Sequence, residues 1–115
     1  MIPTINIPPS SRYTIKEGDT IPEIDFSFAD TDAIDLTGAT IRMQLYLNNV
    51  KHLDISNTLG ITIIDAKNFK IDEIPFAENT LPSGRLKGDL EITLADGVRV
   101  TYTDVYYTIT KEYTV

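Results

Sequence analysis

The stretch that decides the fold is Ile41-Arg42-Met43-Gln44-Leu45-Tyr46-Leu47, in which every second residue is large and aliphatic. Successive side chains of a β-strand point to opposite faces, so this spacing predicts a strand with its aliphatic side chains buried and the others outward. Ile24–Phe28 repeats the pattern, with Asp25 and Ser27 between its apolar residues. Both segments are therefore predicted to be strands with one buried face.

Shorter runs rich in β-branched residues follow the long strand and are separated by Asn, Gly or Lys clusters. We expect these runs to form a meander of hairpins: 51–55, 61–65 and 68–72. Turn residues at 30–33 and at Thr37-Gly38 separate the two longer strands. Pro75 and Pro82 exclude a regular strand between 74 and 81, so this segment is predicted to be a crossover loop with at most one helical turn, in which Phe76 and Leu81 need burial.

A hairpin is predicted around Asp96-Gly97, and its register follows from the apolar residues on either side. A two-residue loop would oppose apolar residues to polar ones. A three-residue loop over 95–97 instead opposes Leu94 to Val98 and Ile92 to Val100, with Gly97 in the left-handed conformation.

The apolar residues change from even to odd positions after Tyr102, which predicts a β-bulge near Thr103-Asp104. Eight or so short strands without a helical pattern predict an all-β fold, a single antiparallel β-sandwich of the immunoglobulin-like kind. Residues 1–12, rich in proline, are predicted to be an extended N-terminal arm, and residues 13–115 the sandwich domain.

Composition narrows the classes of function. The 115 residues contain no Cys, so a disulfide framework, a thiolate zinc site and a cysteine nucleophile are excluded. A net charge of −7 repels a phosphate backbone, so we expect no nucleic acid partner. No segment approaches the roughly 20 apolar residues of a membrane span, and we expect no membrane partner.

Few residues are candidates for chemistry, and we expect neither an enzyme, a metal site nor a cofactor. His52 is the only histidine and lacks a nucleophile motif, so a half-exposed strand position explains it better than catalysis. The carboxylates of Asp30, Asp32 and Asp35 begin like a calcium loop, but the Gly and the final Glu of that pattern are absent. They are interpreted as turn-capping residues. Gly88 falls on an inward face, where we expect close approach of the opposite sheet.

Tyr46 and Tyr106 alternate outward in their predicted strands. Exposed tyrosines can anchor a protein interface or stack on sugar rings. Both residues are therefore candidate interface residues, and a carbohydrate-binding module that recognises glycans of a host surface is the alternative reading.

A series of short motifs runs in order along most of the chain: Glu17-Gly18-Asp19-Thr20, Ile24-x-Phe26-x-Phe28, 35–47, 60–65, Phe69-x-Ile71, Asp89-Leu90-Glu91-Ile92, Asp96-Gly97 and Thr101. In this order and spacing the series resembles small bacteriophage and prophage structural proteins related to the amino-terminal domain of BppU-type baseplate upper proteins. The resemblance covers about residues 13–110. It implies a compact β-sandwich without a catalytic centre, which attaches other proteins to a tail or baseplate.

The resemblance leads us to expect a virion component, made in the cytoplasm of a bacterial host, which acts as an adaptor or decorating subunit. Its expected partners are other virion proteins such as tail, baseplate or fibre subunits, and self-association is left open. The arm supplies three further candidate interface residues, Ile2, Ile5 and Ile7, which are able to dock as an added strand on a neighbour. Disorder of the arm is the alternative interpretation.

Overall fold

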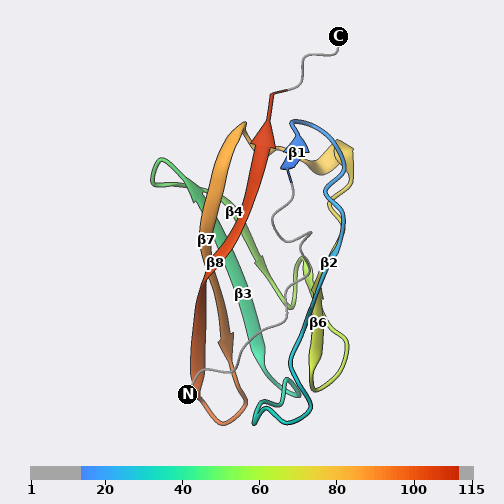
Figure 1. Ribbon diagram of the computed structural model, residues 1–115, viewed down its shortest axis with the longest axis vertical. Helices are drawn as coiled ribbons and strands as arrows, with labels where there is room; N and C mark the ends of the chain where they lie inside the picture. The colour runs from blue at the N-terminus through green and yellow to red at the C-terminus, as the bar shows by residue number, and fades with distance from the viewer. Residues whose placement is uncertain (1–13, 112–115) are drawn as a thin grey trace.

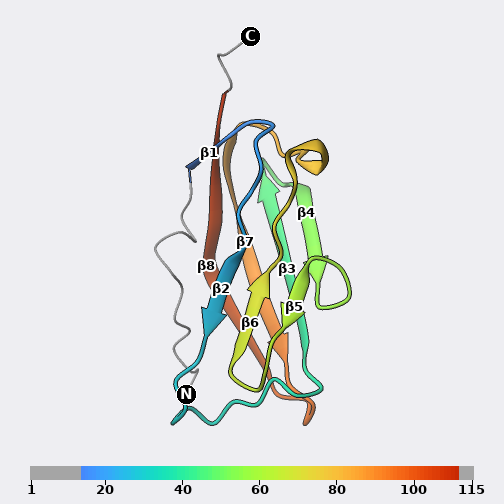
Figure 2. The ribbon, with the colours of Figure 1, turned by 90° about the vertical axis from the view of Figure 1, so that its right-hand side faces the viewer.

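A computed structural model describes residues 14–111, with the side chains of residues 103–105 excepted. The described chain folds into two sheets packed face to face, with the strands running along the long axis of the molecule (Figures 1 and 2). The strands and the 3-10 helix are β1 (Thr14–Lys16), β2 (Ile24–Ser27), β3 (Thr40–Leu47), β4 (Val50–Ser56), β5 (Ile61–Ile63), β6 (Asn68–Ile71), η2 (Phe76–Glu78), β7 (Gly84–Thr93) and β8 (Arg99–Thr110).

The strand order confirms the predicted all-β sandwich. One sheet has five strands in the order β1-β8-β7-β3-β4, and the other has three in the order β2-β6-β5. The chain changes sheet four times: between β1 and β2, β2 and β3, β4 and β5, and β6 and β7. Immunoglobulin-like sandwiches likewise pass repeatedly from one sheet to the other.

Two details of the predicted topology are wrong. The sandwich is not purely antiparallel, because β1 runs parallel to β8, with Thr14 opposite Thr108 and Lys16 opposite Thr110. The segments from 51 to 72 do not form one meander, because β4 belongs to the five-stranded sheet and β5 to the other. The change of sheet lets Ile55 and Ile61 enter the core from opposite layers.

The core lies between the two sheets and consists of the apolar side chains that the alternation predicted. The Phe26 and Phe69 rings stack across β2 and β6, with centroids 4.8 Å apart and an interplanar angle of 2°. Among the side chains that the structure describes within residues 14–111, every buried one belongs to an apolar or aromatic residue. The core is therefore built from apolar and aromatic residues, and the hydroxyl of Tyr107 lies buried within it.

The β7–β8 hairpin has the predicted register. Ile92 lies opposite Val100, and the amide of Leu94 donates to the carbonyl of Val98 over 2.8 Å. Gly97 has φ +92° and donates to the Leu94 carbonyl, as the three-residue loop requires. Val98 is 52% exposed, however, because it lies at the end of the sandwich, beyond the cover of the opposite sheet.

Further along, the bulge near 103–104 is also confirmed. Gly88 lies opposite Val105 and Leu90 opposite Tyr102, so the single residue Asp89 faces two residues of β8. The extra residue moves Tyr107 and Ile109 onto the buried face.

Gly88 packs closely for a different reason from the one expected. A Cβ at this position would lie 1.8 Å from the carbonyl oxygen of Gln44 on β3, a neighbour in the same sheet. The close approach is thus between adjacent strands and not between opposite sheets. It occurs beside the bulge, where the register of β7 against β8 shifts.

A second bulge lies in β4, at the edge of the five-stranded sheet. Leu45 pairs with Leu53 and Tyr46 with Lys51, so His52 is the extra residue. His52 is exposed at this bulge, which agrees with its predicted place in a strand.

The segment 74–81 crosses from one sheet to the other through η2, as predicted. Leu81 is buried, but Phe76 is 68% exposed, so the expectation that both need burial is wrong for Phe76. The Phe76 backbone amide donates to Thr20, which holds this residue at the surface.

Candidate functional site: the outer face of the five-stranded sheet

The outer face of the five-stranded sheet brings together the two tyrosines that the sequence singled out. Tyr46 on β3 lies opposite Lys87 on β7, and Lys87 lies opposite Tyr106 on β8. Lys51 on β4 extends the row on the other side of Tyr46. Cross-strand partners share a face, so the four side chains form one row across four strands, spaced about 4.8 Å apart from strand to strand.

Further cations lie beside this row. Arg85 precedes Lys87 on the same face of β7 and places its guanidinium carbon 4.1 Å from the centre of the Tyr106 ring. Lys16 on β1 lies opposite Thr110 of β8, two positions beyond Thr108. This group, called here the cationic patch, consists of Lys16, Arg85 and Lys87.

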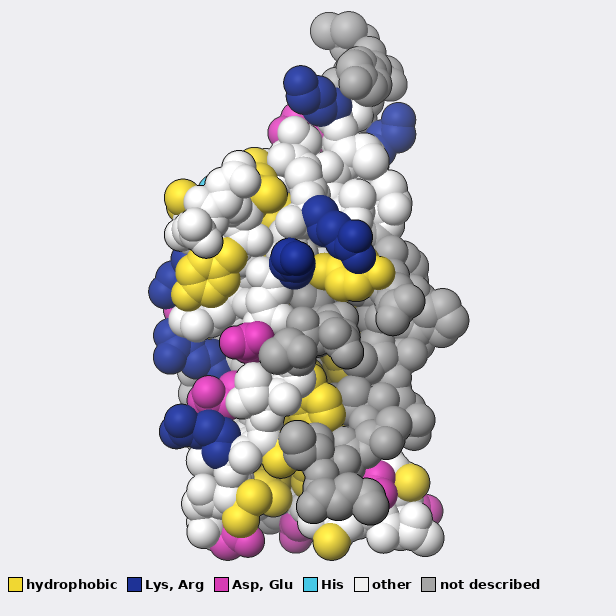
Figure 3. Space-filling view, turned by 60° about the vertical axis from the view of Figure 1, so that its left-hand side comes forward, with side chains coloured by type: hydrophobic (Ala, Val, Ile, Leu, Met, Phe, Trp, Pro, Cys, Tyr) yellow, Lys and Arg dark blue, Asp and Glu magenta, His cyan; other side chains and the backbone are white. Residues whose placement is uncertain are grey.

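The cationic patch forms no ion pair within the described residues. Figure 3 shows Lys and Arg side chains in the upper part of this face and along its left edge, where acidic side chains lie beside the lower ones. The patch is therefore a local positive area on a chain whose net charge is −7.

Cations elsewhere on the sheet are paired. Arg42 contacts Asp54 at 3.0 Å, Lys51 contacts the same carboxylate at 3.1 Å, and Arg99 lies 3.7 Å from Glu91. Hydrogen bonds from Arg42, Gln44 and Lys51 hold the pKa of Asp54 well below its ordinary value. The charge on this part of the sheet is thus largely neutralised.

Six of the nine Lys and Arg residues within 14–111 lie on this outer face: Lys16, Arg42, Lys51, Arg85, Lys87 and Arg99. Most carboxylates lie elsewhere. On the three-stranded sheet Glu23 binds Lys70 at 3.0 Å, beside Asp25 and Asp72. The two sides of the sandwich therefore differ in charge.

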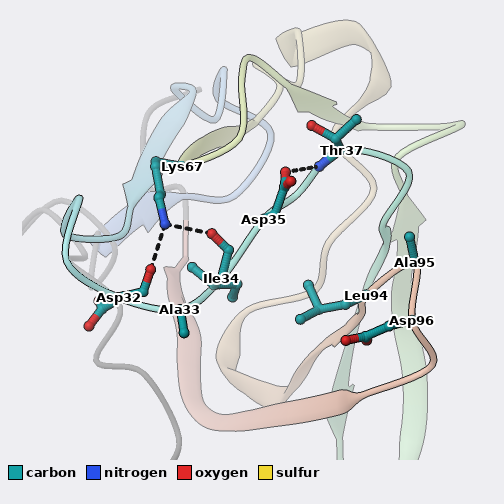
Figure 4. A pocket seen from close by; sticks show the side chains of 9 residues that line it. All are labelled: Asp32, Ala33, Ile34, Asp35, Thr37, Lys67, Leu94, Ala95 and Asp96. Atoms are coloured by element: carbon teal, nitrogen blue, oxygen red, sulfur yellow. Dashed lines mark hydrogen bonds between the residues drawn. The ribbon is translucent and has the colours of Figure 1, made fainter.

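The loops at the end of the sandwich that holds the β7–β8 hairpin are acidic. They line a hollow of about 440 Å³ (Figure 4). Asp32, Asp35 and Asp96 line it together with Lys67. The ammonium of Lys67 donates to the backbone carbonyls of Asp32 and Ile34, at 2.6 Å each. Lys67 thereby ties the turn before β6 to the loop before β3.

Two of the three aspartates that were predicted to be turn caps act in this way. Asp32 accepts a hydrogen bond from the Ala29 amide, and Asp35 accepts one from the Thr37 amide. The latter bond lowers the pKa of Asp35. Asp30 has no such bond in the described structure. Across residues 14–111, no group of three or more His, Asp or Glu residues is placed to hold a metal ion.

The other predicted site residues have different outcomes. Ile2, Ile5 and Ile7 lie outside the described residues. Tyr46 and Tyr106 do share one face, and Tyr46 is 39% exposed. The cationic patch was missed, although its signal was present: Arg85 and Lys87 alternate with Leu86 on the outward side of a strand.

No family model matches the chain, and no curated protein matches it either. In the described part of the chain, no helix has the length and apolar character that crossing a membrane requires.

Proposed function

We propose that this chain is a non-enzymatic structural protein of a phage or prophage virion, an adaptor or decorating subunit that binds other proteins of the tail or baseplate. The resemblance of its motifs to baseplate upper proteins supports the virion context. The observation that best supports binding is the outer face of the five-stranded sheet, where Arg85 and Lys87 of the cationic patch flank Tyr106 and Tyr46 lies in the same row.

This face has the chemistry of a protein interface. Tyrosine and arginine are enriched at interfaces, because each combines a large contact area with hydrogen-bond donors. Unpaired cations attract an acidic partner over a distance and orient it on approach. The N-terminal arm with Ile2, Ile5 and Ile7 remains a proposed second contact, as a strand added to the edge of a neighbouring sheet.

The test asks whether the chain is incorporated into virus particles and whether this incorporation depends on the outer sheet face. Particles released by the bacterium that encodes the chain would be purified by density gradient and analysed by mass spectrometry. We expect the wild-type chain in the particles and at least a tenfold loss of incorporation for Lys87→Glu. Lys70→Glu makes the same charge change on the other sheet and should incorporate normally.

Absence of the wild-type chain from purified particles would contradict the virion proposal. Equal incorporation of Lys87→Glu and wild type, with both proteins folded by circular dichroism, would contradict the role of this face. Deletion of residues 1–11 tests the arm separately, since unchanged assembly would remove the docking proposal for Ile2, Ile5 and Ile7.

The second candidate is a carbohydrate-binding module. The placement of Tyr46 and Tyr106 in one row favours it, because sugar rings stack on exposed aromatic rings. Arg85 lies over the Tyr106 ring, however, and thereby occupies one of its two stacking faces. Binding on a glycan array that is lost in Tyr106→Ala would favour this candidate over the protein adaptor.

A further inference from the structure

The cationic patch and the acidic loops around the hollow lie towards opposite ends of the long axis of the molecule. The cationic patch lies where β8 ends beside β1, whereas the 95–97 hairpin and the loop before β3 lie at the opposite end (Figure 1). Leu94 lies seven positions after Lys87 along an extended chain, which corresponds to about 23 Å. This distance exceeds the Debye length of about 8 Å at physiological salt. The two surfaces therefore cannot neutralise each other within one molecule.

The acidic surface consists of carboxylates on three neighbouring loops. The β5–β6 turn joins the loop before β3 through the bond from the Leu36 amide to the Ala66 carbonyl and through Lys67. The hairpin closes the hollow from the other side. We call these residues the acidic pole: Asp30, Asp32, Asp35, Asp65 and Asp96.

Lys67 lines the same hollow and its charge helps to lower the pKa of Asp35, but it forms no ion pair with a carboxylate of the acidic pole. Lys67 directs its ammonium to two backbone carbonyls, so it compensates about one of five negative charges without pairing with a carboxylate. The cationic patch likewise has no described acid partner. Among the described residues, one chain thus contains both halves of a complementary charge contact, and no ion pair joins either half to a group of opposite charge.

We propose that the cationic patch docks the acidic pole of a second copy of this chain, so that copies join head to tail. The two surfaces differ, so the contact is heterologous, and each docked copy still presents a free patch or a free pole. The result is a ring where the rotation between copies closes, and a row where it does not. This inference rests on the proposed function and names one partner of the same sheet face.

Long-range and local electrostatics oppose each other in this contact. Two molecules of net charge −7 repel, and at 0.01 M salt the Debye length of about 30 Å lets this repulsion act over most of the molecule. At 0.15 M only the facing surfaces interact, and at 1 M even these are screened. We expect association to be strongest near physiological salt and weaker at both extremes.

The test is sedimentation velocity on the full chain over a range of protein and salt concentrations. The patch variant Arg85→Gln/Lys87→Gln should associate at least tenfold more weakly than wild type. Lys70→Glu is its matched control, because it lowers the net charge by the same two units on the other sheet. The pole variant Asp30→Asn/Asp65→Asn/Asp96→Asn keeps the side-chain acceptors of the turns and should also associate at least tenfold more weakly.

The pole variant is less negative than wild type, so general repulsion alone would make it associate more strongly. A mixture gives the decisive result. The patch variant has an intact pole and the pole variant has an intact patch, so an equimolar mixture should form a 1:1 complex although neither protein associates alone. This recovery also shows that both variants are folded.

Wild-type chain that stays monomeric at all salt concentrations would overturn the inference, as would association that persists in the patch variant or a mixture that forms no complex. These outcomes are distinguishable from failure of the proposed function. A monomeric chain that enters particles in a Lys87-dependent manner would retain the adaptor and remove only the second copy as its partner.

Discussion

Arg42 and Asp54 form a two-point ion pair across β3 and β4, with Nε 3.2 Å from Oδ1 and Nη2 3.0 Å from Oδ2. Gln44 and Lys51 donate to the same carboxylate. These four residues join the two strands at the outer face. Since the hydrogen bonds favour the ionised form, the pKa of Asp54 is lower in the folded protein than in the unfolded chain.

This shift predicts how Asp54 affects stability as pH changes. A carboxyl group with a lowered folded-state pKa stabilises the fold fully above its unfolded pKa, near 3.8, and this contribution is lost as pH falls towards the folded value. We expect Asp54→Asn to melt below wild type at pH 7, and the difference to shrink between about pH 4 and pH 2. Thermal unfolding at several pH values measures this. A difference that stays constant down to pH 2 would contradict the assignment.

Gly88 is predicted to be intolerant of any side chain. A Cβ 1.8 Å from the Gln44 carbonyl oxygen can be accommodated only if β3 and β7 move apart. We expect Gly88→Ala to lower the free energy of unfolding by about 2–3 kcal/mol, within the range of overpacked sites. Gly18→Ala is the control: Gly18 has φ +82° but no atom near its Cβ position, so only about 1 kcal/mol is expected there. Equal costs in urea unfolding would show that steric contact is not what requires Gly88.

The three-residue loop of the β7–β8 hairpin depends on the left-handed conformation of Gly97. A β-branched residue is strongly disfavoured there, whereas asparagine tolerates this conformation. We expect Gly97→Val to lower the melting temperature clearly and Gly97→Asn to lower it by less. Nothing lies within 4 Å of the Cβ position, so the comparison isolates the backbone. An unchanged melting temperature for Gly97→Val would argue against this turn.

Stacking of Phe26 on Phe69 should be measurable separately from burial. Both rings are almost fully buried, and their planes are 2° from parallel. Each Phe→Leu variant is expected to destabilise the protein, and a double-mutant cycle should show about 0.5–1.5 kcal/mol of coupling. Chemical unfolding of wild type, both single variants and the double variant gives this value. Additive single variants would mean that the rings contribute only through burial.

Lys67 is predicted to order the loop before β3. Its ammonium is bound to the carbonyls of Asp32 and Ile34, and the neighbouring Ala66 carbonyl accepts from the Leu36 amide. Lys67→Met keeps the aliphatic length and removes both ammonium bonds. We expect faster amide hydrogen exchange at Leu36, with little change at the centre of β7. Uniformly faster exchange would instead indicate global destabilisation.

Much of the fold was readable from local patterns. The alternation in 41–47 gave the orientation of β3, and the apolar residues around Gly97 determined the register of the β7–β8 hairpin. The bulge at 103–104 followed from the change of parity after Tyr102. Each of these predictions depends on residues close together in sequence, where the period of two directly reports the buried face.

The features that the sequence did not predict depend on pairing between distant segments. The parallel contact of β1 with β8 joins residues about 94 positions apart, and a three-residue strand carries almost no pattern of its own. The crowding of Gly88 against Gln44 likewise follows from the pairing of β3 with β7. Predicting the cationic patch would have required two such registers at once, those of β1 and of β7 with β8, although the outward parity of Arg85 and Lys87 was already visible.

The bulge at His52 has a consequence for how copies of this protein can meet. β4 is an outer strand of its sheet, and an outer strand of regular geometry offers its backbone amides and carbonyls to any extended chain. The extra residue interrupts that regular spacing, and the charged side chains of Lys51 and Asp54 lie next to the interruption. Sheets of neighbouring molecules are thereby hindered from fusing along this side into one continuous sheet. Crowded copies can then touch through their surfaces and separate again as intact, individually folded molecules.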